Sequence, residues 1–467
     1  MRKLFTNVFL VAIFLIVVVI FIFVQYKITK DAKNVNANIT KADYYVSSTS
    51  GSDTNDGSVT SPWKTIQKAA DIVKPGDTVC VRGGTYNEKV TMKTSGTMNA
   101  YITFINYEGE SPIINGENQE VSNDDLENAL ILIQGKSYIK VIGFNVKNYV
   151  STNEYAPAGI RVTGTSKNVE IRNCKIYKIK TTYSESSESR NAYGIAVHGT
   201  NGERSLDGLV IDSCEVYDCI LGESESVVLN GNVTNFTVSN NKIHDNDNIG
   251  IDFIGYENTS SKNDYVRNGV CSGNEVWNIS SGSNKKYEDK SADGIYVDGG
   301  TSIIIEKNKV WNTDIGIEIA SEHKNRATDD VIVLNNLVYN SNTYGICMGG
   351  FTTSKGNATN IKIYNNTVYN SNINMNIQKN CQFDSNIIKN NIFYEGTTYS
   401  GDDSNIVNSN NITSNPKFIK AGEDFHLNVN SPAINYGVND TIIDSVDMDG
   451  KKRIIGEKVD CGCYEKQ

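Results

Sequence analysis

Four stretches of the sequence share one register: residues 303–311 (IIIEKNKVW), 331–339 (VIVLNNLVY), 361–369 (IKIYNNTVY) and 386–394 (NIIKNNIFY). Each contains an alternating apolar segment, a polar turn with Asn at a fixed place, and then an apolar and an aromatic residue. The same register continues backward to about residue 168. Its fixed turn column reads Cys174, Cys214, Asn241, Asn274, Asn308, Asn336, Asn366 and Asn391.

The repeat predicts a coil of stacked parallel strands. Its period varies between about 25 and 40 residues, which is typical of solenoids and related repeat proteins. The alternation within each unit is that of strands, and long helical stripes are absent. In such a coil, neighbouring turns lie about 4.8 Å apart, so stacked Asn side chains can hydrogen-bond along the axis. Asn also tolerates the left-handed conformation that a sharp turn needs.

The segment that precedes the repeats carries a family resemblance. Residues 44–88 (YYVSSTSGSDTNDGSVTSPWKTIQKAADIVKPGDTVCVRGGTYNE) resemble the opening of bacterial pectate-lyase-like right-handed β-helix proteins, with a short cap helix over 66–73. Residues 415–437 (NPKFIKAGEDFHLNVNSPAINYG) are similar to the closing segment of many such exported proteins. The resemblance implies an all-β, right-handed parallel β-helix over 44–415, followed by a closing segment over 416–467. It also implies carbohydrate chemistry without fixing the reaction, because the superfamily includes lyases, hydrolases, epimerases and non-enzymatic surface proteins.

The N-terminus predicts export. Residues 8–24 (VFLVAIFLIVVVIFIFV) carry no charge and follow Arg2 and Lys3, so we expect a membrane anchor within 1–26 and a tether over 27–43. A cleaved signal peptide is the alternative. The bulk of the chain would then lie at the cell surface, as a monomer.

Composition narrows the partners. The net charge of −10 argues against nucleic acid or an anionic membrane surface as the main partner, whereas a neutral polysaccharide is compatible with it. The nine cysteines show no metal-binding or disulfide spacing, so most of them are expected to be buried free thiols.

A second recurring strand predicts the working face. It reads YGIAVHG, SVVLNGN, IGIDFIG, DGIYVDG, IGIEIAS and YGICMGG, and alternation directs two residues of each strand outward. Most of these outward positions are small or neutral, but Asp252, Tyr296, Asp298 and Glu318 interrupt them on successive coils. We therefore expect the functional groove here.

Glycoside hydrolysis is the leading hypothesis for this groove. Asp298 and Glu318 lie one coil and two residues apart, which gives roughly 8 Å between their Cβ atoms. Glycosidase carboxyl pairs are separated by about 5–5.5 Å in retaining and about 6.5–9.5 Å in inverting enzymes. We predict Glu318 as acid/base, Asp298 as its partner and Asp252 as a third catalytic candidate; the swapped roles of Glu318 and Asp298 stay open. The predicted substrate-binding residues are Tyr296, His323, Asn230, His198 and Glu322.

Two alternatives stay open. A Ca²⁺-dependent polysaccharide lyase would hold its metal on Glu288, Asp289 and Asp293, or on Asp252, and would need a basic residue to abstract a proton. Glu223 and Glu225 in GESESVVLNG are similar to calcium ligands of alginate lyases, but Asn230 stands where those enzymes have their base. The other alternative is a non-catalytic surface β-helix that binds glycans.

Overall fold

The computed structural model describes residues 42–182, 190–287, 289–350, 352–381, 385–440 and 442–467. The predicted membrane segment lies outside the described residues. Residues from Asp43 to Gln467 form one compact unit. Within the described ranges, no helix is both long and apolar enough to cross a bilayer.

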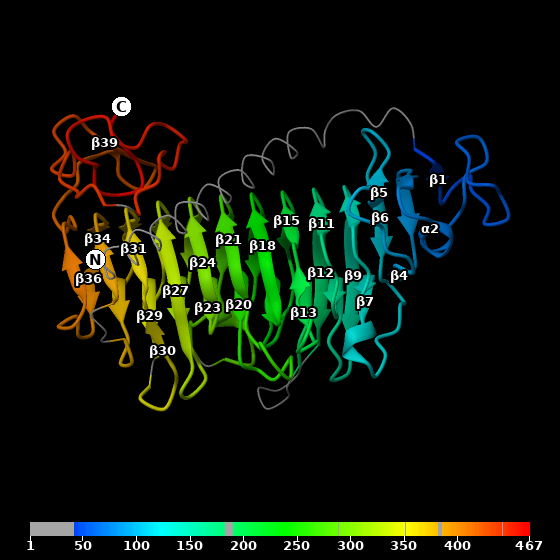
Figure 1. Ribbon diagram of the computed structural model, residues 1–467, viewed down its shortest axis with the longest axis horizontal. Helices are drawn as coiled ribbons and strands as arrows, with labels where there is room; N and C mark the ends of the chain where they lie inside the picture. Colours follow the sequence, from blue (N-terminus) through cyan, green and yellow to red (C-terminus); the bar gives the residue numbers. More distant parts are fainter. Residues whose placement is uncertain (1–41, 183–189, 288, 351, 382–384, 441) are drawn as a thin grey trace, which may run out of the picture. The chain divides into compact units, whose positions relative to one another are not determined.

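Three sheets of parallel strands make up this unit (Figure 1). The first sheet contains β1 (Tyr44–Val46), β2 (Thr78–Val81), β5 (Ile102–Asn106), β8 (Ile139–Ile142), β11 (Val169–Arg172), β15 (Val210–Asp212), β18 (Val233–Ser239), β21 (Arg267–Ser272), β24 (Thr301–Glu306), β27 (Ala327–Leu334), β31 (Lys362–Tyr364), β34 (Ile387–Lys389) and β37 (Val407–Ser409), with β14 (Leu206–Asp207) and β30 (Asn357–Thr359) beside them. The second sheet contains β4 (Val90–Thr91), β7 (Ala129–Gln134), β10 (Ala158–Thr163), β13 (Tyr193–Gly199), β17 (Val227–Gly231), β20 (Ile251–Ile254), β23 (Asp293–Asp298), β26 (Ile315–Ala320), β29 (Tyr344–Gly349), β33 (Ile373–Ile377) and β36 (Thr397–Ser400). The third sheet contains β3 (Gly84–Tyr86), β6 (Pro112–Asn115), β9 (Asn145–Ser151), β12 (Lys175–Thr181), β16 (Glu215–Tyr217), β19 (Lys242–Asn246), β22 (Glu275–Ile279), β25 (Lys309–Thr313), β28 (Leu337–Tyr339), β32 (Thr367–Tyr369) and β35 (Ile392–Tyr394).

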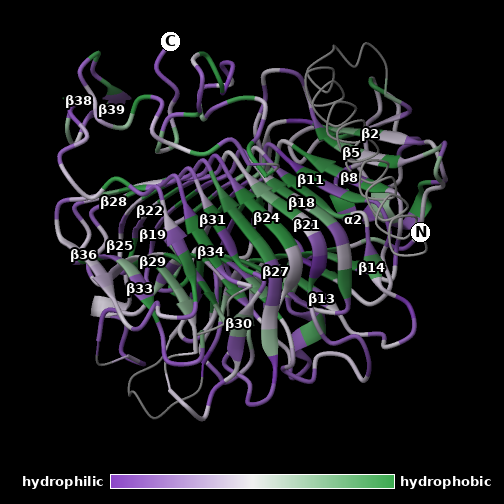
Figure 2. Cartoon of the chain, turned by 60° about the vertical axis from the view of Figure 1, so that its left-hand side comes forward, coloured by the Kyte–Doolittle hydropathy of each residue, from purple (hydrophilic) through white to green (hydrophobic). Residues whose placement is uncertain are grey.

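The chain visits the second, first and third sheets in turn on each coil. It runs from β23 to β24 to β25 and then begins the next coil with β26. Each strand pairs in parallel with the corresponding strand of the next coil, as β23 does with β26. Inward apolar side chains from all three sheets form one continuous core, and Figure 2 shows hydrophobic residues concentrated in the strands. The predicted parallel β-helix is thus the observed architecture.

The Asn column forms a hydrogen-bonded ladder between the first and third sheets. Asn308, for example, donates from Nδ2 to Asn336 Oδ1 at 3.0 Å and to the Cys271 carbonyl at 3.0 Å. The same bond links successive members from Asn241 to Asn411. One detail of the prediction was wrong: the left-handed conformation falls on the residue before each ladder Asn, such as Lys307 with φ 55°. The ladder side chain can therefore point inward while its neighbour makes the turn.

An aromatic stack follows the outer face of the third sheet. It joins Tyr177, Tyr217, His244, Trp277, Trp311 and Tyr339, with neighbouring ring centroids 4.2 to 5.9 Å apart. The rings come from the aromatic column of the sequence repeat, and parallel pairing aligns them. The stack therefore extends the repeat's regularity to the outer surface.

The two ends of the coil are closed differently. Helix α2 (Ile66–Ile72) lies where the cap helix was predicted; Thr65 caps it and Ile66, Ala69 and Ala70 are buried. Toward the C-terminus, β38 (Phe418–Lys420) and β39 (Asp424–Leu427) form an antiparallel hairpin. Its residues Phe418 and Phe425 pack against Tyr369 of the third sheet. The short helices η1 (Asp125–Glu127) and η2 (Ser281–Ser283) lie in loops. All nine cysteines are buried free thiols, as expected.

Candidate functional site

The strand register brings the predicted groove residues onto one face of the second sheet. Asp252 pairs with Tyr296, and Tyr296 pairs with Glu318 on the next coil. Asp298 pairs with Ala320, so it lies diagonally from Glu318, as the alternation predicts. One outward column therefore holds Asp252, Tyr296 and Glu318, and the neighbouring column holds Asp298.

These carboxyl groups point away from the core and are nevertheless buried. The exposed fraction is 2% for Asp252, 5% for Asp298 and 7% for Glu318. A carboxyl group without water favours its neutral form, because burial penalises the charge. Burial is accordingly the largest cause that raises the pKa of each of the three above its usual range.

Tyr296 lies at the centre of this face. Its phenol is buried, and burial raises its pKa well above the ordinary value. The carboxyl groups of Asp298, Glu318, Glu322 and Asp293 add to the shift, in that order. Carboxyl groups from two coils and one following turn therefore surround a single hydroxyl group.

Glu318 is held by two hydrogen-bond donors. Gln378 donates from Nε2 to Glu318 Oε1 at 2.8 Å. The carboxyl group of Asp293 also hydrogen-bonds to Glu318, which raises the pKa of Asp293 and lowers that of Glu318. Burial, the first cause for both, raises the pKa of Asp293 well above its usual range. Asp293 and Glu318 therefore share a proton in a hydrogen bond between two buried carboxyl groups, and burial raises the pKa of both.

Asp298 has different neighbours. Its Oδ1 accepts the backbone N–H of Glu322 at 2.8 Å, and its Oδ2 lies 3.9 Å from His323 Nε2. Burial raises its pKa well above its usual range, and the single backbone hydrogen bond offsets only part of that effect. Glu257, in the turn after β20, completes a group whose ligand atoms all lie within 4.8 Å of one another.

Asp252 belongs to a further set of buried acids. Its Oδ1 is buried and has no hydrogen-bond partner. Glu225 is 8% exposed, and after burial its pKa is raised mainly by Glu257 and Asp298. Asp252 in turn has its pKa raised by burial and then by Glu225. In the described part of the chain, no Lys or Arg forms an ion pair with either of them.

The remaining predicted binding residues are spread more widely. Asn230 donates from Nδ2 to Glu257 Oε2 at 2.7 Å, which places it beside the group around Asp298. Glu322 is exposed and pairs with Lys355 at 3.0 Å. His198 lies farther along the sheet, 3.3 Å from Arg161 Nη1. Burial first and then Arg161 lower its pKa to about 3, so it stays neutral.

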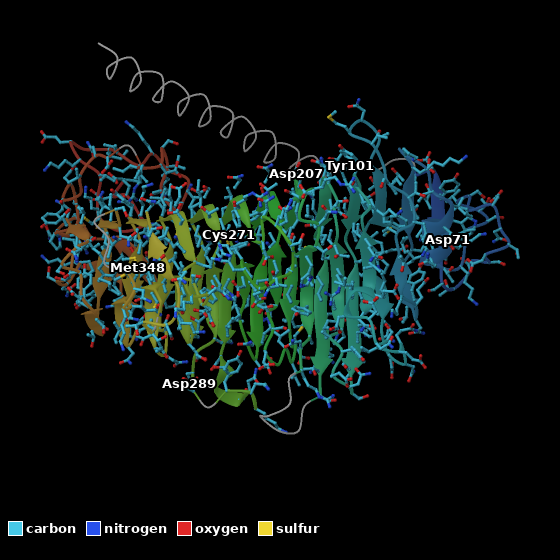
Figure 3. All side chains as sticks on the ribbon, turned by 60° about the horizontal axis from the view of Figure 1, so that its bottom comes forward. Asp71, Tyr101, Asp207, Cys271, Asp289 and Met348 are labelled. Atoms are coloured by element: carbon cyan, nitrogen blue, oxygen red, sulfur yellow. The ribbon has the colours of Figure 1, made fainter. Side chains whose placement is uncertain are left out.

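The acids of the predicted calcium loop are described only at Asp289 and Asp293. Glu288 lies outside the described residues. Asp289 is exposed on a loop beyond the strands (Figure 3), whereas Asp293 begins β23 and bonds to Glu318. Among the described residues, the group of three that is suited to a metal ion is Glu257, Asp298 and His323.

Sequence reasoning missed two members of the site. Glu257 and Gln378 lie beyond the ends of β20 and β33, where strand alternation no longer predicts direction. Polar residues in the turns that follow the groove strands are the sequence signal that would have identified Glu257 and Gln378.

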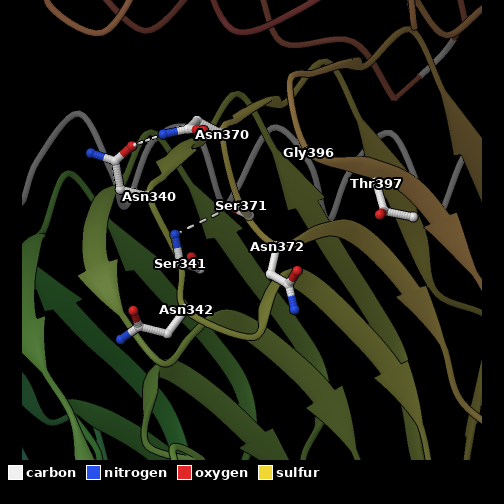
Figure 4. A pocket seen from close by; sticks show the side chains of 8 residues that line it. All are labelled: Asn340, Ser341, Asn342, Asn370, Ser371, Asn372, Gly396 and Thr397. Carbon is white, nitrogen blue, oxygen red and sulfur yellow. Dashed lines mark hydrogen bonds between the residues drawn. The ribbon is translucent and has the colours of Figure 1, made fainter.

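A separate concavity lies over turns of three later coils (Figure 4). Residues 340–342 (NSN), 370–372 (NSN) and 396–397 (GT) line an open cavity of about 570 Å³. Asn370 donates to Asn340 Oδ1 at 2.9 Å within it. The lining holds no titratable side chain, so the acid–base chemistry belongs to the second sheet.

Comparison with known proteins identifies the family. The family model of the Pel9A-like right-handed β-helix region matches residues 44–219. The uncharacterized protein YwoF of Bacillus subtilis is 40% identical over 329 residues, which cover 70% of this chain and 68% of that protein. The chain belongs to the Pel9A-like right-handed β-helix family.

Two further proteins place this Pel9A-like chain beside pectate lyases. Pectate lyase PEL9 of Emericella nidulans is 30% identical over 206 residues, which cover 41% of this chain and 46% of that protein. The crystal structure of pectate lyase Pel9A superposes with a TM-score of 0.55 at 15% identity, covering 91% of this chain and 96% of that one. The second likeness shows the fold alone. The pectate-lyase-like right-handed β-helix grouping predicted from sequence is thereby confirmed.

Proposed function

We propose that this Pel9A-like protein is a glycoside hydrolase that cleaves a neutral polysaccharide with Asp298 and Glu318. The single observation that carries the proposal is the buried Tyr296 hydroxyl group, which lies among the buried carboxyl groups of Asp298, Glu318 and Asp293. Glycosidases need one carboxyl group that holds a proton and one that does not. The register separates Asp298 and Glu318 by one coil and one column, roughly 8 Å between Cβ atoms.

The local contacts suggest a role for each carboxyl group. Burial raises the pKa of Glu318, and the hydrogen bonds from Gln378 and Asp293 offset part of that rise, so we assign Glu318 as the base. Asp298 has one backbone donor and carboxylate neighbours, which favour its protonated form, so we assign it as the acid. Asp293 is a positioning residue that holds Glu318 through the shared proton.

The charge of the face favours a neutral glycan over a polyuronate. Asp252, Asp298 and Glu318 form no ion pair with Lys or Arg of the described chain. Such a surface offers no cationic side chain to pair with the carboxylates of an anionic sugar chain. We therefore expect neutral polysaccharides to be the better substrates.

The test is an assay of a neutral polysaccharide panel with the variants Glu318→Gln and Asp298→Asn. Each is expected to lower kcat/KM by at least about 10²-fold, the scale of general acid–base catalysis. Asp289→Asn, on the exposed loop, is the matched control and should keep wild-type activity. Full activity in both groove variants would contradict the proposal.

A second substrate separates the two roles. An aryl glycoside with a good leaving group needs little protonation, so Asp298→Asn should recover much of its activity on that substrate. Glu318→Gln should not recover, because the base is still required. Recovery by Glu318→Gln alone would reverse the assignment of acid and base.

Ca²⁺-assisted elimination is the second candidate, favoured by the likeness to pectate lyase PEL9. It requires a Lys, Arg or Tyr near the metal to abstract a proton; the outward positions of β20, β23 and β26 hold no Lys or Arg, and Tyr296 is the candidate base among them. The distinguishing measurement is the ultraviolet absorbance of an unsaturated product from a polyuronate. If that absorbance appears and is lost with a chelator, elimination replaces hydrolysis; binding without any turnover would instead indicate a glycan-binding protein.

We also propose that the protein acts outside the cell. The support is the uncharged stretch 8–24 preceded by Arg2 and Lys3. Protease added to intact cells should degrade the chain, while a cytoplasmic marker stays intact. Protection of both proteins would place the chain inside.

A further inference from the structure

Three metal-ligating side chains meet at one edge of the second sheet. Glu257 lies in the turn after β20, Asp298 ends β23, and His323 lies in the turn after β26. Because equivalent turns of a coil stack about 4.8 Å apart, residues from three successive coils converge there. One ligand atom from each residue lies within 4.8 Å of the other two.

Each of the two acids has one oxygen occupied by an orienting partner. Glu257 Oε2 accepts from Asn230 Nδ2 at 2.7 Å, and Thr259 in turn donates to Asn230 at 2.7 Å. Asp298 Oδ1 accepts the Glu322 N–H at 2.8 Å, which leaves Oδ2 facing His323. Partners of this kind orient the ligands in known metal sites.

His323 supplies the observation that points to a ligand. Its Nε2 atom is buried and has no hydrogen-bond partner, although it lies 3.9 Å from Asp298 Oδ2. A buried nitrogen without a partner is destabilising, because it has given up its hydrogen bond to water. Asp252 adds a buried Oδ1 atom without a partner, on a side chain only 2% exposed. A cation at this point would satisfy these atoms and compensate the charge.

The wall beside His323 is aromatic. The Tyr256 ring lies 6.4 Å from the His323 ring and packs against Tyr265. It lies over Gly299, where φ is +80° and a Cβ atom would come within 2.8 Å of the ring. The glycine after Asp298 therefore allows the ring to shield this edge of the group.

We propose that Glu257, Asp298 and His323 bind a divalent transition-metal ion of the Zn²⁺ class. An imidazole combined with two carboxylates suits zinc, whereas calcium prefers oxygen ligands alone. Three protein ligands leave a fourth position open. The proposal rests in part on the proposed function, because Asp298 is assigned there as the acid. An ion bound to Asp298 would withdraw that carboxyl group, so zinc would inhibit hydrolysis.

The test is isothermal titration of ZnCl₂ into the full-length chain, purified in detergent and stripped with a chelator. We expect one Zn²⁺ per chain, with affinity at least about tenfold weaker in His323→Gln and in Glu257→Gln. His426→Gln is the matched control, because His426 lies in the C-terminal hairpin and already bonds to Asp424 and Asp449 at 2.6 and 2.9 Å. Circular dichroism of each variant verifies that it folds.

Two results would overturn the proposal. One is wild-type protein that takes up no Zn²⁺ beyond the level of His323→Gln. The other is Ca²⁺ bound as tightly as Zn²⁺ and unaffected by His323→Gln, which would mean a site made of carboxylates alone. Because the titration uses no substrate, its failure is distinguishable from failure of the hydrolase assay. If zinc inhibits hydrolysis by the wild type but not by His323→Gln, the metal site and the hydrolase activity are linked.

Discussion

Two stacked columns of polar side chains run along the same coil and behave in opposite ways. In the ladder from Asn241 to Asn411, each coil repeats the same residue, and every side chain bonds to the next coil. In the column of Asp252, Tyr296 and Glu318, the residue changes at every coil. There an oxygen of Asp252 stays without a partner, and carboxyl groups lie against one another.

The difference separates structure from function. A residue that repeats in register and satisfies its own hydrogen bonds is explained by the coil itself. Buried acids that vary from coil to coil are costly unless something outside the chain uses them. Variants in the two columns should therefore have opposite consequences, with stability lost from the ladder and activity lost from the groove.

The largest loss of stability is expected from Asn308→Leu. Asn308 bonds to Asn336 and to the Cys271 carbonyl, and it accepts from Asn274 N and Nδ2 at 2.9 Å. Leucine would leave several buried groups without partners, each costing about 1–3 kcal/mol. We expect the free energy of unfolding, measured with urea, to fall by about 3–5 kcal/mol.

The control for this variant is Asn372→Leu, on the exposed lining of the polar cavity. It should change stability by no more than about 0.5 kcal/mol, as most surface substitutions do. A loss below about 1 kcal/mol for Asn308→Leu would show that the ladder is not a main source of stability.

A smaller loss is expected from Trp277→Ala in the aromatic stack. The Trp277 ring lies 4.2 Å from His244 and 4.9 Å from Trp311, with nearly parallel planes. Each such pair contributes about 0.5–1.5 kcal/mol beyond the buried area. Urea unfolding should show a loss of about 2 kcal/mol, with Trp277→Phe intermediate. Equal stability of wild type, Trp277→Ala and Trp277→Phe would show that the aromatic stack does not stabilise the fold.

The smallest effect on stability, and one of opposite sign, is expected from Asp293→Asn. Burial raises the pKa of Asp293 in the folded chain, while the unfolded value stays near about 3.9. The folded state thus binds the proton more tightly, so its contribution is full below pH about 4 and is lost as the pH rises through the folded pKa.

The variant should therefore flatten the fall in urea midpoint with rising pH and gain about 1 kcal/mol relative to wild type at neutral pH. Asp289→Asn should keep the wild-type pH dependence. A wild-type midpoint that rises with pH over the same range, with no change in Asp293→Asn, would contradict the shared proton.

Much of the site followed from the repeat. The alternation in GIYVDG and GIEIAS correctly placed Tyr296, Asp298 and Glu318 on the outer face, because parallel pairing preserves side-chain direction from coil to coil. Burial of these acids did not follow. The alternation predicts which residues face outward but not what covers them, and contacts such as Gln378 with Glu318 come from residues far along the chain.

The sequence by itself determined the coil, its ladder and its cap, because these depend on short periodic patterns and on local turn chemistry. Only the tertiary structure decided which acids meet. It joined Asp293 to Glu318 and Asp298 to Glu257 and His323, since such encounters depend on how turns of different length fold over the sheet. The period of the repeat determines in which direction a side chain within a strand points. The neighbours of a residue beyond the end of a strand depend on three-dimensional packing alone.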